Sequence, residues 1–139
     1  MTPSFVADSS VAIAWVVPSQ ANAASRRLHE EIESGTRFVV PVLWFFEVAN
    51  TLLMLARRRK IDDREQSLAR QYLHQLRALV DEVDSQRVFG AILDLANKYS
   101  LSVYDATYLE VSLRKNLPLA SRDDALNRAA KAAGIECLG

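Results

Sequence analysis

Short apolar runs alternate with longer segments of helical periodicity, and this alternation limits the fold more than any other feature of the sequence. The runs have strand length and lie at residues 4–7, 37–40, 80–83, 117–120 and 135–138. The helical segments cover residues 10–17, 21–34, 43–59, 63–79, 85–99, 102–113 and 123–133. Strands that alternate with helices predict a parallel sheet covered on both faces. We expect an α/β fold with a small parallel sheet of about 4–5 strands, flanked by about 7 helices in three α/β/α layers.

The bulk properties of the chain favour one globular domain spanning residues 1–139. Lys and Arg number 17, as do Asp and Glu, so the formal net charge is zero. A nucleic-acid partner would therefore be held by a local basic patch rather than by overall charge. The single cysteine, Cys137, suits a reducing cytosol. No apolar stretch approaches the ~18 residues of a membrane span. We expect a cytoplasmic protein without a membrane segment.

The first apolar run ends at Asp8, which is followed by Ser9 and Ser10 and then by a helical segment. In open α/β sheets, ligands bind just beyond the carboxyl ends of the strands. Asp8 is therefore a candidate site residue. The alternative is that Asp8 only caps the following helix, since Asp is a favoured cap. The positions of three further acids weigh against that alternative.

Glu47 is the second acid and lies in the apolar segment LWFFEVANTLLML. Burying a glutamate as an ion is costly unless it has a partner. On a helix, Asn50 and Thr51 would share its face, which gives a polar stripe on an apolar helix. The alternative, a Glu47 that simply faces water, is weak because its neighbours are mostly large and hydrophobic.

The third and fourth acids each lie near the start of a helix. Asp105 falls in the first turn after Ser102, which is the better cap. Asp123 follows the run at residues 117–120 by three positions, and Asp124 is its neighbour. We prefer Asp123, but the sequence leaves the choice between these two aspartates open.

If the sheet is parallel, these acids can converge on one edge. Two carboxylates ~4 Å apart repel by about 4 kcal/mol at an effective dielectric constant near 20. A divalent cation removes that cost, and Mg²⁺ or Mn²⁺ prefers hard oxygen ligands. His29 and His74 stand apart in the sequence, and no cluster of His or Cys suggests zinc.

Around these four acids the chain resembles the PIN-domain ribonucleases, specifically the VapC-type toxins of type II toxin–antitoxin systems. The motifs are VADSSV, FFEVAN, YDATYLEVSLR and LASRDDAL, and the resemblance spans essentially the whole chain. It implies a small parallel sheet wrapped by helices and Mg²⁺- or Mn²⁺-dependent hydrolysis of RNA phosphodiester bonds. It also implies a homodimer that a cognate antitoxin protein neutralises.

The resemblance also implies roles for individual residues. Asp8 and Asp105 would bind the principal metal, with Glu47 and Asp123 binding directly or through water. The three residues that would support the substrate are Ser9, Asn50 and Ser121. Two alternatives stay open: a PIN-like RNA-processing nuclease without a toxin role, and a non-catalytic PIN-like binding module. The presence of all four acids speaks against the second.

Two further groups of residues have more than one interpretation. The basic run Arg57, Arg58, Arg59 and Lys60 could contact RNA, or it could simply favour the dipole at a helix C-terminus. The aromatic residues Trp44, Phe45 and Phe46 could serve the core, a dimer interface or an antitoxin groove. Tyr104 and Tyr108 lie beside Asp105, where packing is favoured over base stacking.

Overall fold

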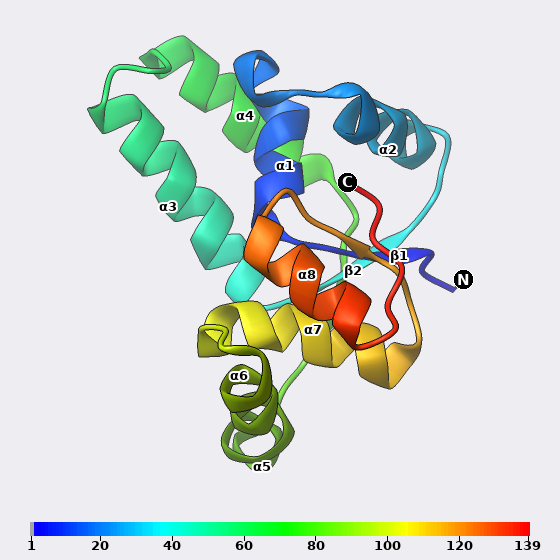
Figure 1. Cartoon of the computed structure of the whole chain (residues 1–139). Helices are drawn as coiled ribbons and strands as arrows, with labels where there is room; N and C mark the ends of the chain where they lie inside the picture. The colour runs from blue at the N-terminus through cyan, green and yellow to red at the C-terminus, as the bar shows by residue number, and fades with distance from the viewer. Residues whose placement is uncertain (1) are drawn as a thin grey trace.

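A computed structural model describes residues 2–139 and contains one four-stranded parallel sheet (Figure 1). The strand order is β3-β2-β1-β4. The strands are β1 (Phe5–Ala7), β2 (Phe38–Pro41), β3 (Leu79–Asp81) and β4 (Leu119–Ala120). The predicted α/β class and small parallel sheet are confirmed. The run at residues 135–138 does not form a full strand, because only one parallel bridge joins Cys137 to Leu119.

Strand β1 lies inside the sheet, and its backbone forms hydrogen bonds with a neighbouring strand on each side. Val6 pairs with Val39 of β2 and with Leu119 of β4. Pro118 has no N–H to donate, but its carbonyl accepts the Val6 N–H at 2.9 Å, so the proline does not interrupt this pairing. All three residues of β1 are buried, as expected for a strand covered on both faces. This central position fixes where β1 delivers Asp8.

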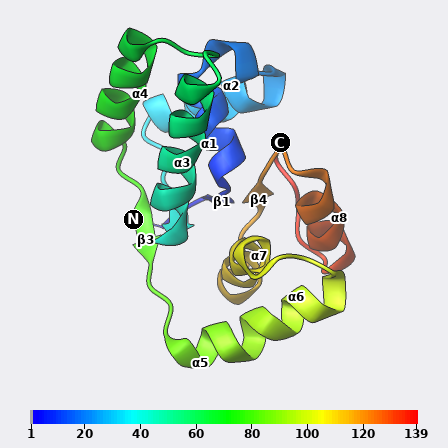
Figure 2. The same cartoon turned by 90° about the vertical axis from the view of Figure 1, so that its left-hand side faces the viewer.

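The helices form layers on the two sides of the sheet. Figure 2 shows α1 to α4 on one side and α6 and α7 on the other. Helix α7 packs on β1 and β2, whereas α1 packs against α2 and α3. The α-helices are α1 (Ser9–Val16), α2 (Ala23–Glu33), α3 (Leu43–Arg57), α4 (Asp63–Gln75), α5 (Ser85–Arg87), α6 (Leu93–Tyr99), α7 (Val103–Lys115) and α8 (Asp124–Ala132).

The segment at residues 85–99 differs from the single helix that its periodicity predicts. It consists of the short α5, a π-helical stretch η2 (Val88–Ile92) and α6. A π-helical stretch adds a residue to the turn, so the side chains after it rotate relative to those before it. Ile92 is fully buried, whereas Phe89 faces solvent. The π-helical stretch therefore divides the predicted single helix into α5 and α6.

Candidate active site

The four acids singled out in the sequence converge at the carboxyl-terminal edge of the sheet. Asp8 follows β1 and caps α1, and Asp123 follows β4 and caps α8. Glu47 lies on α3, and Asp105 lies in the first turn of α7. Asp8 and Asp123 repel each other, Asp105 repels both, and Glu47 repels Asp8 and Asp105. We call these four residues the site acids.

Asp8 is the most enclosed of the four, with 5% of its surface exposed. Its Oδ1 accepts the Ser9 backbone N–H at 2.7 Å and has a weak contact with Ser9 Oγ at 3.4 Å. Its Oδ2 accepts two hydroxyl hydrogen bonds, from Ser10 at 2.9 Å and from Ser121 at 2.7 Å. Oδ1 is therefore the oxygen with more remaining capacity to bind a further partner.

The two hydroxyls on Asp8 Oδ2 are held as donors by the loop that precedes α8. Ser121 Oγ accepts the backbone N–H of Asp123 at 3.0 Å. Ser10 Oγ accepts the backbone N–H of Arg122 at 2.9 Å. Each hydroxyl hydrogen then points to Asp8, and the loop is fixed to the end of β1. Ser9 and Ser121 were expected near the site, whereas the part played by Ser10 was missed. A second hydroxyl directly after Asp8-Ser9 was the available sequence signal.

Glu47 reaches the site from α3 and is held by a residue of α7. The Tyr108 hydroxyl donates to Glu47 Oε1 at 2.5 Å, across 61 positions of sequence. Burial, together with the nearby carboxylates, raises the pKa of Tyr108, so this phenol remains a donor. The packing role favoured for Tyr108 is therefore incomplete, because its hydroxyl also belongs to the site. Tyr104 is 61% exposed.

The structure separates Asp123 from its neighbour Asp124. Asp123 is the N-cap of α8 and accepts the Leu126 N–H at 2.8 Å. Its charge repels the carboxylates of Asp8 and Asp105. Asp124 is the first residue of α8, and exposure does not distinguish the two aspartates, because both are exposed. Asp124 contributes to none of the shifts in the pKa of the other site acids. The geometry therefore favours Asp123 as the fourth acid.

Burial and repulsion make the ionised forms of Asp8, Glu47 and Asp105 unfavourable. Burial, opposed by hydrogen bonds and reinforced by neighbouring charge, raises the pKa of both Asp8 and Glu47. Burial and the charges of Asp123 and Asp8 raise the pKa of Asp105 to about 6. Among residues 2–139, no Lys, Arg or His nitrogen lies within 4.0 Å of a carboxylate oxygen of the site acids. The negative charge is therefore uncompensated.

The chemistry of these donors fits a hard divalent cation. All are carboxylate oxygens, which Mg²⁺ and Mn²⁺ prefer, and they lack a basic partner. Within the described part of the chain, no three Asp, Glu, His or Cys side chains are already arranged as ligands of one ion. Repelling carboxylates move apart when no cation holds them. Oδ1 of Asp8 and the carboxylates of Glu47, Asp105 and Asp123 are the groups that would hold such an ion.

Two other predicted groups form no hydrogen bond or ion pair with the site acids in residues 2–139. Asn50 is exposed on α3, and the structure gives its side chain no hydrogen bond in residues 2–139. The basic run begins at Arg57, ten residues after Glu47 on the same helix, which places it about 15 Å away along the axis. Arg59 adopts a left-handed conformation with φ of 56° in the turn after α3. The site acids and the basic run are therefore not adjacent.

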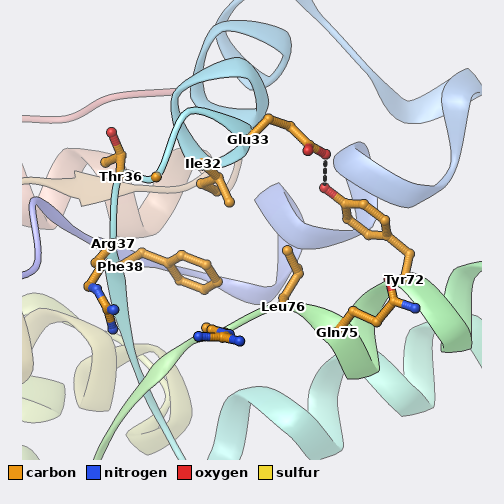
Figure 3. Close-up of a pocket in the computed structure, with 10 residues that line it drawn as sticks. Ile32, Glu33, Thr36, Arg37, Phe38, Tyr72, Gln75 and Leu76 are labelled. Carbon is orange, nitrogen blue, oxygen red and sulfur yellow. Dashed lines mark hydrogen bonds between the residues drawn. The ribbon is translucent and has the colours of Figure 1, made fainter.

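A cavity of about 420 Å³ lies at the opposite, amino-terminal edge of the sheet (Figure 3). Arg37, Phe38 and Arg77 contribute to its lining. On its wall, the Tyr72 hydroxyl donates to Glu33 at 2.6 Å. None of the site acids lines this cavity. The cavity is therefore separate from the carboxyl-terminal edge of the sheet, where the site acids lie.

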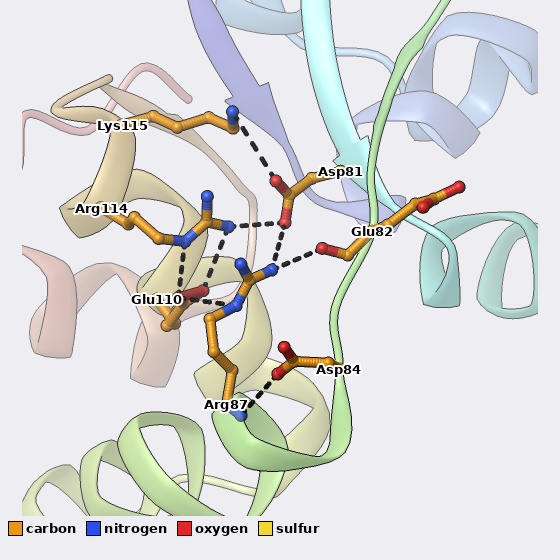
Figure 4. A network of polar contacts seen from close by, with 7 residues as sticks. All are labelled: Asp81, Glu82, Asp84, Arg87, Glu110, Arg114 and Lys115. Atoms are coloured by element: carbon orange, nitrogen blue, oxygen red, sulfur yellow. Dashed lines mark hydrogen bonds and ion pairs between the residues drawn. The ribbon is translucent and has the colours of Figure 1, made fainter.

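A second group of acids is fully paired (Figure 4). Asp81 Oδ2 accepts Arg114 at 2.6 Å and Arg87 at 3.3 Å, and its Oδ1 lies 3.6 Å from Lys115 Nζ. Glu110 Oε1 lies 2.7 Å from Arg114 and 3.5 Å from Arg87. We call these five residues the ion-pair network. The sequence analysis did not predict it, although Glu110 and Arg114 have the i, i+4 spacing of a helical ion pair.

Comparison with known proteins identifies the family of the chain. The family model described as PIN domain matches residues 5–132. No curated protein matches the chain. Helices long and apolar enough to cross a membrane are absent from residues 2–139.

Two solved structures are similar in fold. PAE2754 from Pyrobaculum aerophilum has a TM-score of 0.73 at 20% identity, over 98% of this chain and 84% of that chain. FitAcB from Neisseria gonorrhoeae has a TM-score of 0.65 at 14% identity, over 97% of this chain and 96% of that chain. PIN domains are in general metal-dependent nucleases. With its parallel sheet and a family match over nearly its whole length, this chain belongs to the PIN domain family.

Proposed function

We propose that this protein is a Mg²⁺- or Mn²⁺-dependent endoribonuclease that hydrolyses RNA phosphodiester bonds. The observation that carries the proposal is the meeting of four acids, from four separate elements, at one edge of the sheet without a basic partner. A site built to bind RNA by charge alone would present cations instead. Uncompensated carboxylates at the carboxyl ends of parallel strands suit a metal-assisted reaction on a phosphate.

Each site residue has a distinct task in this proposal. Asp8 and Asp105 hold the principal metal ion, and Glu47 and Asp123 hold it directly or through water. A bound divalent ion supplies a water of lowered pKa and neutralises charge on the phosphate oxygens. Ser10 and Ser121 keep the Asp8 carboxylate in place through Oδ2. Ser9 holds Oδ1 through its backbone N–H.

The proposed contact between RNA and the basic run needs a long substrate. The run lies about 15 Å from Glu47 along α3, so it would meet a phosphate several nucleotides from the scissile bond. Neutralising Arg57, Arg58, Arg59 and Lys60 together should flatten the salt dependence of RNA binding, because fewer counterions are released. An unchanged salt dependence would assign these residues to solubility and the helix dipole.

We further propose that the protein is a cytoplasmic, homodimeric toxin held inactive by a cognate antitoxin. Phe45 and Phe46 of α3 support a protein partner, because they are 44% and 71% exposed while their neighbour Trp44 is buried. Large exposed aromatic side chains are typical of protein interfaces. Induced expression in a bacterial host should arrest growth. RNA cleavage in vitro without such arrest would favour an RNA-processing nuclease.

RNA cleavage by matched variants tests the nuclease proposal. Wild type, Asp8→Asn, Asp123→Asn and Asp124→Asn are incubated with total RNA and Mg²⁺ or Mn²⁺. We expect Asp8→Asn and Asp123→Asn to lose at least ~100-fold in rate, the scale of removing a transition-state interaction. Asp124→Asn makes the same chemical change one residue away and should keep the wild-type rate. Cleavage that survives both Asp8→Asn and Asp123→Asn would refute the proposal.

A further inference from the structure

The phenol of Tyr108 connects two of the site acids through one helix. Asp105 lies three residues before Tyr108 on α7, so the two side chains share a face of that helix. Asp105 lies near Asp8 and Asp123, whose charges repel it. The Tyr108 hydroxyl donates a hydrogen bond to Glu47 of α3. One element thus presents the third acid and holds the second.

The hydrogen bond from Tyr108 to Glu47 is short, and the tyrosine that donates it is held rigidly by the core. Its length is 2.5 Å, in the range of a charge-assisted O–H···O⁻ bond. The tyrosine has no exposed surface, so its ring cannot swing away without disturbing the core. The hydroxyl is therefore held by the packing of its ring and by its bond to Glu47.

Glu47 has no other polar side-chain contact to fix its rotamer in residues 2–139. Its carboxylate stands at the end of a flexible side chain, near Asp8 and Asp105, which repel it. Without a tether it would turn toward solvent, where its charge is hydrated and the repulsion is screened. Tyr108 occupies Oε1, which leaves Oε2 with no hydrogen-bond donor among residues 2–139.

We propose that Tyr108 is a positioning residue: its hydroxyl holds Glu47 against the repulsion of the other acids, so that the site binds its divalent cation with Glu47 already in place. This inference rests on the proposed metal-dependent function. Holding a ligand in place before the ion arrives removes an ordering cost from binding. Tyr108 therefore acts through Glu47 and contacts neither metal nor RNA.

Mn²⁺ binding to the purified, metal-free protein tests the inference without any RNA. Titration calorimetry compares wild type, Tyr108→Phe and Tyr104→Phe. Each substitution removes one phenolic oxygen from α7, but Tyr104 is exposed and its hydroxyl forms no hydrogen bond with a site acid in residues 2–139. We expect Tyr108→Phe to weaken Mn²⁺ binding about tenfold, the scale of losing one hydrogen bond to a charged group. Tyr104→Phe should bind as wild type does.

A double-mutant cycle separates positioning from a general effect on folding. If Tyr108 acts only through Glu47, Tyr108→Phe should add nothing to the loss of Mn²⁺ affinity caused by Glu47→Gln. Additive losses would overturn the inference. Glu47→Asp is the second variant, because it keeps the charge on a shorter side chain. It should also weaken Mn²⁺ binding, and wild-type affinity in that variant would show that position does not matter.

The outcomes distinguish this inference from the function on which it rests. If wild type binds Mn²⁺ and Asp8→Asn does not, the metal site stands. Unchanged Mn²⁺ affinity in Tyr108→Phe would then overturn the positioning role alone. If wild type binds no Mn²⁺, both the proposed function and the inference fail. A further readout is the cleavage reaction, in which Tyr108→Phe should raise the Mn²⁺ concentration needed for half-maximal rate while Tyr104→Phe leaves it unchanged.

Discussion

The site acids and the ion-pair network each include a buried carboxylate, but only the network surrounds its acids with cations. Asp8 directly follows β1 and Asp81 is the last residue of β3, and they are 5% and 8% exposed. Helix α7 contributes to both groups, with Asp105 in the first and Glu110 in the second. The network surrounds its two acids with Arg87, Arg114 and Lys115 (Figure 4). In the described residues 2–139, no such cation pairs with a site acid.

This difference shows that burial of an acid does not by itself indicate a functional site. In the ion-pair network, charge is neutralised by the protein's own side chains, which fix β3 and the start of α5 to α7. Among the site acids, charge stays uncompensated, and the pKa of three of them is raised, mainly by burial. An uncompensated cluster is less stable by itself and is available to an external cation.

The largest expected effect is the loss of Arg114, which contacts both acids of the network. Arg114→Met would leave Asp81 and Glu110 enclosed with weaker partners. We expect it to lower the free energy of unfolding by ~3 kcal/mol, the usual cost of breaking a buried pair. Arg128→Met on α8 is the matched control, because Arg128 is exposed and forms no ion pair in the described part of the chain. Urea denaturation measures both. Equal losses would mean that the network is not structural.

The next effect is stabilisation by metal, which should act on the site acids alone. An ion present at ~100 times its dissociation constant adds about 2.7 kcal/mol to the free energy of unfolding. We expect Mn²⁺ to raise the melting temperature of wild type and of Arg114→Met by similar amounts. Asp8→Asn should show no rise. Thermal denaturation with and without Mn²⁺ provides the measurement, and a rise that persists in Asp8→Asn would place the metal elsewhere.

A smaller effect is expected from the hydroxyl that orients Asp8. Ser121→Ala removes the 2.7 Å donor to Asp8 Oδ2 and frees the end of the loop before α8. Loss of one hydrogen bond to a charged group should weaken Mn²⁺ binding up to about tenfold. Ser34→Ala removes an exposed hydroxyl that bonds only the Glu30 carbonyl, so it serves as the control. Calorimetry with Mn²⁺ compares them. Equal affinity in the two variants would remove Ser121 from the site.

The smallest expected effect is the pH dependence of the free energy of unfolding of the metal-free protein. The pKa of Asp105 is raised from 3.8 to about 6, so the folded chain binds more protons than the unfolded chain between these values. Its contribution to stability is therefore fully present below about pH 4 and is lost as the pH rises through about 6. Because Asp105 is only half-buried, water screens the effect, and we expect less than ~1 kcal/mol.

Urea denaturation of the metal-free protein at several pH values measures this contribution, with Asp105→Asn as the comparison. The variant should lose that part of the pH dependence and be slightly more stable than wild type near neutral pH. In the ion-pair network, Glu110→Gln should instead lower stability near neutral pH, since it removes an attractive pair. If both substitutions change stability in the same direction, the contrast between the two groups is wrong.

The sequence predicted the class of fold and the positions of the acids along the chain. Alternating apolar runs and helical segments are local patterns, and a parallel sheet is their usual consequence. The sequence predicted a strand before Asp8 and another before Asp123, and therefore both acids at one edge of a parallel sheet. Both strands, β1 and β4, are present in the structure. The weak final run lacked enough pairing to form a strand and remained a single bridge.

Only the tertiary structure decided which side chains meet and which are neutralised. The bonds from Tyr108 to Glu47 and from Arg114 to Asp81 join residues 61 and 33 positions apart. No local pattern encodes such contacts, because they depend on how α7 packs on the sheet and on the neighbouring helices. The preference for Asp123 over Asp124 as the fourth acid likewise comes from the tertiary structure, in which Asp123 rather than Asp124 lies near Asp8 and Asp105. In sequence an acid is only a charge; packing determines whether an arginine or an external cation is left to balance it.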